Sequence, residues 1–82
     1  MKKLGLIAGG GELPLIVARN AQQKGLKITV ISVINPIDSE LKDLADNTHI
    51  VSLNDVVNVI GILKNECINE VVMVGRAQKN DI

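Results

Sequence analysis

The sequence predicts an α/β fold, with an open parallel sheet of about four strands and helices on both faces. Short runs rich in Ile, Val and Leu, each about the length of a strand, alternate with longer segments in which apolar residues recur at helical spacing. Glycine or proline separates several of these segments. Strands that alternate with helices in this way form parallel sheets.

The first half of the chain predicts two strands with a helix between them. Residues Lys3–Ala8 form an apolar run that ends at glycine, which is typical of a strand buried on both faces. Residues Pro14–Lys24 are amphipathic and predict a helix, because proline fits a first helical turn and Gly25 follows its end. Residues Lys27–Ile34 are nearly all apolar or β-branched and predict a second buried strand, which Pro36 ends.

The second half predicts four further elements, in the order helix, strand, helix, strand. Their ranges are Asp38–Asp46, Thr48–Val51, Ser52–Cys67 and Glu70–Val74. In the longer helix, Ser52 and Asp55 resemble a capping box. Cys67 is the one cysteine of the chain, so it forms no disulfide within it, and its place in an apolar helical pattern predicts a buried thiol.

Right-handed crossovers in the common doubly wound pattern predict the strand order 3-2-1-4, a Rossmann-like sheet. The chain then winds outward from the first strand and restarts on its other side with the fourth. Ligands of open α/β sheets bind at such a switch point, outside the carboxyl ends of the strands. The two loops that reach this point are "GGGELP" and "GRAQKND".

The first of these loops predicts an anion site, most often used for phosphate. Gly9, Gly10 and Gly11 lead directly into a helix N-terminus, where free N–H groups and the helix dipole favour negative charge. Glu12 and Leu13 complete the loop and belong to the same predicted site. The alternative is a tight turn with no ligand.

In the second loop, Gly75 ends the fourth strand, and Arg76 and Lys79 could hold a phosphate oxygen or a carboxylate. The alternative is a solvated tail. Glu12 and Asp81 could bind Mg²⁺ near the same crevice, but solvated surface carboxylates are the simpler interpretation.

Several site classes are excluded. A GxGxxG fingerprint needs glycine where Pro14 stands, and the acidic residue expected at the end of the second strand is missing because Asp38 lies beyond Pro36. No Lys–Ser/Thr pair follows the glycines, so the loop is not a P-loop. His49 has no partner at metal-ligand spacing, which favours a structural role. No nucleophile–base pair is evident, so no catalytic residue is assigned.

The amino-acid composition limits the classes of partner that the protein can bind and the cell compartment in which we expect it. The 82 residues suffice for one domain, carry no net formal charge and include no Phe, Tyr or Trp, which argues against nucleic-acid binding. No apolar run approaches the length of a membrane span, and the N-terminal apolar run is too short for a signal peptide. We expect a cytoplasmic protein.

The segment "KLGLIAGGGELP" resembles the opening of the LpxI-type UDP-2,3-diacylglucosamine pyrophosphatases of lipid A biosynthesis, and "VVMVGRAQKNDI" is similar to a later segment of that family. Lys79-Asn80 stands where the family usually has Arg-Pro. The resemblance implies a two-domain enzyme that hydrolyses UDP-diacylglucosamine to UMP and 2,3-diacylglucosamine 1-phosphate with Mg²⁺ or another divalent metal. It places the catalytic aspartate in the second domain and Gly9, Gly10 and Gly11 in the cleft between the domains.

We therefore expect residues 1–82 to form the N-terminal domain, inactive alone, of an enzyme whose catalytic C-terminal domain is absent. Its expected partners are the nucleotide-lipid substrate, the missing domain and a second copy of the chain, with peripheral contact to the inner membrane for the whole enzyme. In this fragment, Val71, Val72 and Val74 of the fourth strand should be partly uncovered. The alternatives are a stand-alone module that binds a nucleotide or phosphometabolite, and an assembly domain completed through the edge of the fourth strand.

Overall fold

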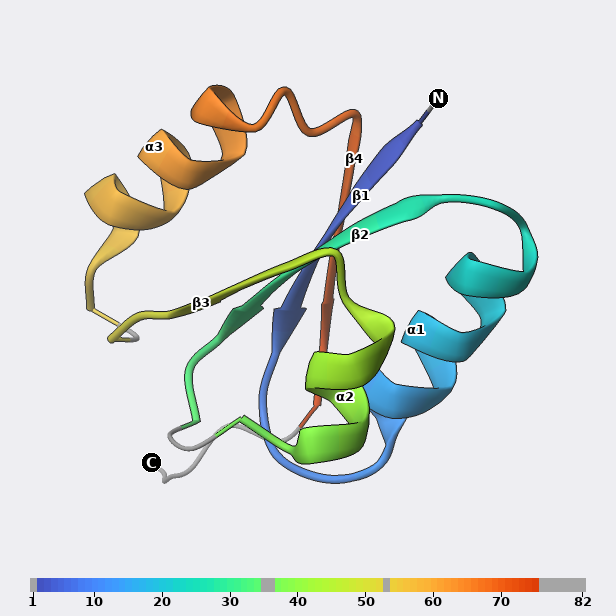
Figure 1. Cartoon of the computed structure of the whole chain (residues 1–82). Coiled ribbons are helices and arrows are strands. Elements are labelled where there is room, and N and C mark those ends of the chain that lie inside the picture. Colours follow the sequence, from blue (N-terminus) through green and yellow to red (C-terminus); the bar gives the residue numbers. More distant parts are fainter. Residues whose placement is uncertain (1, 35–36, 53, 76–82) are drawn as a thin grey trace.

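The computed structural model describes residues 2–34, 37–52 and 54–75 and confirms the α/β fold (Figure 1). Its elements are β1 (Lys3–Ala8), α1 (Leu13–Gln23), β2 (Lys27–Ser32), α2 (Ser39–Leu44), β3 (Asn47–Ile50), α3 (Val56–Asn65) and β4 (Glu70–Val74). The described strands are all parallel and lie in the order β3-β2-β1-β4, as the sequence predicted.

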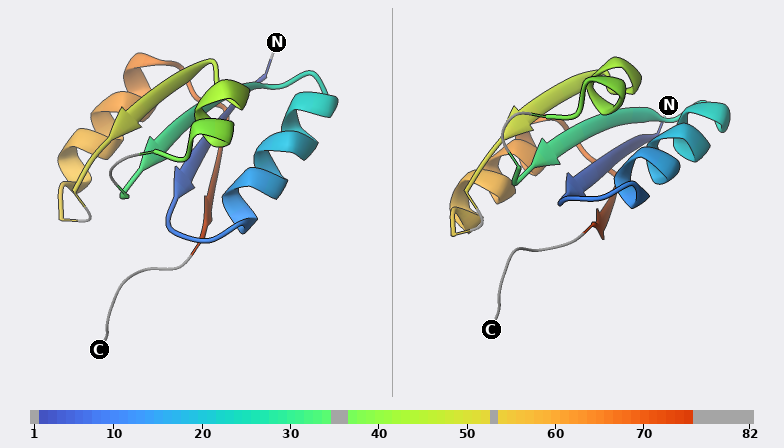
Figure 2. Two further views of the ribbon diagram at one scale, coloured as in Figure 1. Left: turned by 60° about the horizontal axis from the view of Figure 1, so that its bottom comes forward. Right: turned by 90° about the horizontal axis from the view of Figure 1, so that it is seen from below.

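The helices lie in two layers, with α1 and α2 on one face of the sheet and α3 on the other (Figures 1 and 2). Side chains alternate between these faces along each strand. Leu4 and Leu6 of β1 belong to the core cluster on the α1 side. Gly5 faces α3, and a Cβ added to it would lie 3.0 Å from side-chain atoms of both Leu63 and Ile68.

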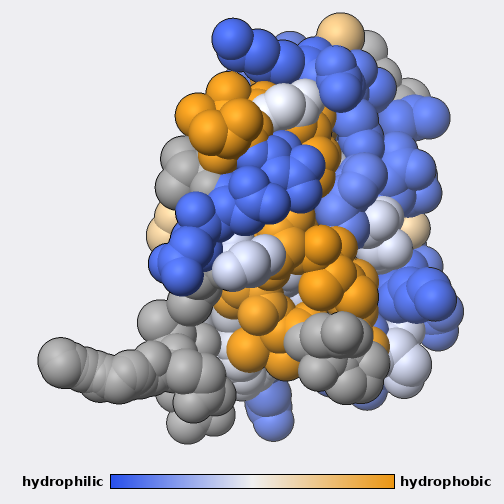
Figure 3. Space-filling view, turned by 90° about the vertical axis from the view of Figure 1, so that its left-hand side faces the viewer, coloured by the Kyte–Doolittle hydropathy of each residue, from blue (hydrophilic) through white to orange (hydrophobic). Residues whose placement is uncertain are grey.

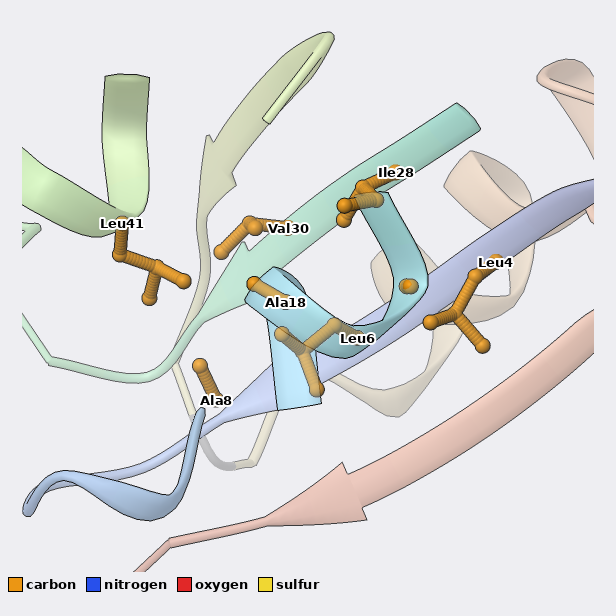
Figure 4. Packing of buried hydrophobic residues seen from close by; sticks show 8 residues of the cluster. Leu4, Leu6, Ala8, Ala18, Ile28, Val30 and Leu41 are labelled. Atoms are coloured by element: carbon orange, nitrogen blue, oxygen red, sulfur yellow. The ribbon is translucent and has the colours of Figure 1, made fainter. Parts of the chain in front are cut away.

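The core lies between the sheet and the α1–α2 layer (Figure 4). It is built without aromatic residues, from aliphatic side chains of β1 and β2 against the helices. Its buried members are Leu4, Leu6, Ala8, Ala18, Ala21, Ile28, Val30 and Leu41. The two alanines of α1 let the helix pack closely on the strands, and Leu41 brings α2 onto the same core.

The α3 face of the sheet is covered less completely. Val57 of α3 is 83% exposed and Met73 of β4 is 76% exposed. Seen from this side, apolar surface lies among polar regions (Figure 3). Of the three β4 valines expected to be partly uncovered, Val71 is exposed, whereas Val72 and Val74 are half-buried and pack against the core.

The N-terminus of α3 differs from the prediction. The helix begins at Val56, and its N-cap is Asp55, whose Oδ1 accepts a hydrogen bond from the Asn58 N–H at 3.3 Å. The Ser52 hydroxyl instead accepts from the Asn54 N–H at 3.3 Å. The predicted Ser52 cap is therefore wrong, because the serine closes a local turn ahead of the helix.

The C-terminus of α3 corrects the prediction for Cys67. The helix ends in a Schellman motif, in which the Ile68 N–H donates to the Leu63 carbonyl at 3.1 Å and the Cys67 N–H donates to the Lys64 carbonyl at 3.2 Å. This motif places Cys67 in the left-handed region, with φ of 55°. Cys67 lies beyond the last helical turn and is exposed, so the buried thiol expected from the apolar pattern is wrong.

Candidate functional site

The glycine loop contacts the end of β4 at Gly75, the residue with which the second predicted loop begins. The Gly9 N–H donates to the carbonyl of Val74, the last residue of β4, at 2.9 Å. A Cβ added to Gly75 would lie 2.8 Å from the Gly9 nitrogen and 2.9 Å from the Gly10 oxygen. Gly75 also has a φ of 105°. The ends of β1 and β4 therefore pack backbone against backbone, and a side chain at position 75 would force them apart.

The loop ahead of α1 presents backbone donors. Within the described residues, the N–H groups of Gly11, Glu12 and Leu13 donate to no protein acceptor. Glu12 is the N-cap residue, but its side chain makes no capping hydrogen bond, and the first turn of the helix holds no acidic residue. Pro14, in the first turn, has no N–H to offer. As far as the described residues go, these N–H groups and the positive end of the α1 dipole are available to an anion.

A hollow opens on each side of this loop. The hollow toward β4, which we call the β4-side hollow, has a volume of about 360 Å³. It is lined by Gly10, Gly11, Glu12, Leu13, Ile16 and Gly75. The β2-side hollow, toward β2 and α2, has a volume of about 270 Å³. It is lined by Gly9, Gly10, Gly11, Pro14, Leu15, Ser32, Ile34, Asp38 and Leu41. Gly10 and Gly11 border both, so a group bound at the loop would lie between the two.

The wall of the β2-side hollow is shaped by Ser32, the last residue of β2. Its hydroxyl accepts from the Ile34 N–H at 3.0 Å and donates to the Ile34 carbonyl at 2.6 Å. The Val33 N–H donates to the Ala8 carbonyl at 3.0 Å, which ties the same turn to the end of β1. Ser32 is buried and both of these hydrogen bonds are local, so its role is to hold Ile34 at the rim of the hollow.

Asp38 also lines this hollow, although its spacing along the sequence argued against a place near the glycine loop. It is the N-cap of α2, and its Oδ1 accepts from the Glu40 N–H at 2.9 Å. Its other carboxylate oxygen has no hydrogen-bond partner in the part of the chain that the structure describes. The sequence feature that could have predicted this position is that aspartate is a preferred N-cap and Asp38 directly precedes a short helix. The helix after the second strand begins at the same edge of the sheet as the glycine loop.

Of the predicted site residues, the structure brings together Gly9, Gly10, Gly11, Glu12, Leu13 and Gly75. Leu13 is 60% exposed and borders the β4-side hollow. Arg76, Lys79 and Asp81 lie outside the described residues. No Lys, Arg or His is found among the described residues that line the two hollows, so the positive potential there comes from backbone N–H groups.

A separate polar cluster lies under the C-terminus of α3. The Glu66 carboxylate accepts from the Thr29 hydroxyl at 2.7 Å and from the Asn47 amide at 3.1 Å, and it contacts the His49 ring. Burial raises the pKa of Glu66, but the hydrogen bonds from Thr29 and His49, the charge of His49 and the Asn47 amide outweigh it and hold the pKa below its usual value of 4.5. The cluster joins α3 to β2 and β3, in keeping with a structural role for His49.

In the described ranges, no group of three or more His, Cys, Asp or Glu side chains converges as a set of metal ligands. Those ranges also contain no helix with the length and apolar character needed to cross a membrane.

The fold and the site define a class: a Rossmann-like α/β domain with a glycine loop and a helix N-terminus at its switch point. The chain belongs to the LpxI family, because the family model for the LpxI N-terminal domain matches residues 3–82. A search of curated proteins finds no match.

Proposed function

We propose that this chain is the nucleotide-binding N-terminal domain of a UDP-2,3-diacylglucosamine pyrophosphatase. Such an enzyme hydrolyses the pyrophosphate of UDP-2,3-diacylglucosamine and releases UMP and 2,3-diacylglucosamine 1-phosphate. Membership of the LpxI family supports this proposal, as do the motifs that the chain shares with these enzymes. In this proposal the chain binds and orients the substrate within the lipid A pathway.

The observation that carries the proposal is the row of N–H groups that lie between two hollows and have no acceptor among the described residues. A pyrophosphate has a different substituent on each phosphorus, so its binding site needs donors in the middle and room on both sides. The N–H groups of Gly11, Glu12 and Leu13 supply the donors, and the hollows supply the room. Bound in this way, the pyrophosphate would be held by the helix dipole and the two ends of the substrate would diverge.

The divalent metal expected for this reaction finds no fitting set of ligands among the described residues. Among the described residues, Glu12 is the one carboxylate bordering the β4-side hollow, and Asp38 the one bordering the β2-side hollow. Hard cations such as Mg²⁺ bind several oxygens at once, so single carboxylates in separate hollows do not suit them. We therefore assign metal binding and the activation of water to a further domain, and assign no chemical step to this chain.

The lipid part of the substrate bears on where the enzyme acts and on its partners. The substrate is a lipid whose nucleotide head is polar, so an enzyme that binds the head in water can take it from the membrane surface through peripheral contact. We propose a cytoplasmic enzyme that touches the inner membrane in this way. The further domain and a second copy of the chain are its proposed protein partners.

The test is a titration of the chain with UMP, followed by amide NMR. We expect shifts at Gly9–Leu13 and Gly75. In Gly10→Asp, a carboxylate beside the donors repels the phosphate, so UMP affinity should fall at least about tenfold. Gly61→Asp is the matched control, since position 61 lies on α3 with no atom within 4 Å of an added Cβ. It should bind UMP as the unaltered chain does.

Two results would contradict the proposal. One is a chain that gives no shifts with UMP at the glycine loop. The other is a Gly10→Asp variant that keeps its fold, as judged by its amide spectrum, and still binds UMP with unchanged affinity, because the phosphate would then lie elsewhere.

A further inference from the structure

The two hollows beside the glycine loop differ in chemistry. The β4-side hollow is bordered by exposed apolar side chains, with Leu13 60% and Ile16 48% exposed. The β2-side hollow, of about 270 Å³, is lined by residues from the glycine loop, the start of α1, the end of β2 and the start of α2. Its apolar lining comes from Pro14, Leu15, Ile34 and Leu41, and Asp38 is the one charged side chain that the described residues contribute to it.

The Asp38 carboxylate limits what this hollow can accept. Its Oδ1 is occupied by the Glu40 N–H, which fixes the side chain as the N-cap of α2. Its second oxygen has no hydrogen-bond partner among the described residues and belongs to a side chain that lines the hollow. A carboxylate would repel a second phosphate here but would accept hydrogen bonds from hydroxyl groups, so the ligand portion that fits is uncharged and bears hydroxyls.

We propose that the β2-side hollow binds the ribose of the nucleotide, with Asp38 accepting hydrogen bonds from the 2′- and 3′-hydroxyls. This inference rests on the proposed function, in which the phosphate lies at the glycine loop. Gly10 and Gly11 border this hollow, so a ribose joined through its 5′ carbon and oxygen to a phosphate at the loop can reach it. Leu15, Ile34 and Leu41 then provide apolar contacts for the sugar ring and the base.

The substrate contains two sugars, and they differ in the hydroxyl groups that they can offer to Asp38. A carboxylate oxygen is well suited to two adjacent hydroxyls. Ribose carries such a pair, whereas the 2- and 3-positions of the glucosamine are acylated and have no hydroxyl. The ribose is therefore the better match for Asp38, and the acylated sugar would leave the loop on the β4 side, where the exposed apolar side chains lie.

The test compares UMP with 2′-deoxy-UMP on the chain and its variants. Hydrogen bonds to a charged acceptor are strong, so the unaltered chain should bind UMP about tenfold more tightly than 2′-deoxy-UMP. In Asp38→Asn this ratio should fall to within about twofold, because the negative acceptor is lost. Asparagine is as good an N-cap as aspartate, so α2 should keep its fold. Glu40→Gln is the control, since Glu40 lies in the same helix but does not line the β2-side hollow, and it should keep the tenfold ratio.

A second measurement does not depend on any variant. Amide shifts caused by UMP should include Ile34 and Leu41, and those caused by a glucosamine 1-phosphate acetylated at both the 2- and the 3-position should not. Equal binding of UMP and 2′-deoxy-UMP by the unaltered chain would overturn the ribose assignment and leave the proposed function standing. Shifts at Ile34 and Leu41 with the sugar phosphate alone would assign this hollow to the other sugar. A chain that does not bind UMP at all would overturn both proposals.

Discussion

At the scale of single residues, α1 and α3 end in the same backbone motif but place different residues at its left-handed position. Gly25 follows α1 with φ of 78°, and Cys67 follows α3 with φ of 55°. The two helix ends share the same pair of closing hydrogen bonds. Left-handed backbone costs roughly 1–2 kcal/mol for a residue with a Cβ and is readily adopted by glycine. The end of α3 is therefore strained at one residue.

We expect Cys67→Gly to raise the free energy of unfolding by about 1 kcal/mol, because relief of the strain exceeds the added flexibility of the unfolded chain. Chemical denaturation measures this difference. Cys67→Ala removes the thiol but keeps the strained φ, so it should change the free energy by no more than about 0.5 kcal/mol. The reverse change at the other helix, Gly25→Ala, should destabilise by about 1 kcal/mol. Equal effects of glycine and alanine at position 67 would count against the strain.

At the scale of elements, α3 is held on the sheet by polar contacts as well as by apolar ones. Glu66, at the end of α3, accepts hydrogen bonds from Thr29 of β2 and Asn47 of β3. The Lys3 ammonium donates to the Glu66 carbonyl at 3.0 Å, which adds β1 to the same junction. Val57 and Ile60 of the helix are apolar and exposed, so these contacts at one end do much to orient it.

The pKa of Glu66 gives this junction a dependence on pH. Because the folded-state pKa lies below the unfolded value near 4.5, the carboxylate stabilises the fold above that pH, and this contribution is lost as the pH falls through the folded pKa. At neutral pH, Glu66→Gln should lower the free energy of unfolding by about 1.5–3 kcal/mol, the usual range for hydrogen bonds to a charged group. The two proteins should converge in stability as the pH drops below about 4.5.

Urea denaturation at a series of pH values measures this convergence. Glu70→Gln removes one carboxylate at the start of β4, outside the cluster, and so separates the effect of the cluster from that of net charge. If Glu66→Gln and Glu70→Gln give the same difference from the unaltered chain at every pH, the cluster does not stabilise α3 in the way described.

The elements also show what could be predicted from the sequence. The order of the strands, and with it the meeting of the first glycine loop and the end of the fourth strand at the switch point, followed from alternating patterns and right-handed crossovers. Asp38 was not predicted to lie at the site, because it comes later in the chain than the acidic residue that the GxGxxG fingerprint places at the end of the second strand. Its position beside the glycine loop depends instead on the turn that Ser32 closes after β2. The Glu66 cluster was missed because it depends on how β2, β3 and the end of α3 are placed relative to one another, and no local pattern encodes that.

At the scale of the whole molecule, the site and the well-packed side of the domain coincide. The glycine loop follows β1, the strand that pairs with both β2 and β4, and it leads into α1, whose Ala18 and Ala21 are buried in the core. The opposite layer leaves Val57 and Met73 exposed. The donors of the loop are thus carried by the most constrained part of the fold, which suits a site that must hold a substrate in one orientation.

This arrangement predicts that the chain binds the nucleotide but does not catalyse hydrolysis of the substrate. The chain should bind UMP but release none from UDP-2,3-diacylglucosamine above the rate in buffer, with or without Mg²⁺. The described residues that line the hollows offer one carboxylate each, Glu12 and Asp38, and neither hollow holds a nucleophile paired with a base. Chromatography of UMP released from the lipid substrate in detergent measures the rate, and Gly10→Asp serves as the control for contaminating activity. Release that the unaltered chain supports and Gly10→Asp abolishes would mean that this domain contributes catalytic groups of its own, and the assignment of water activation to a further domain would then be wrong.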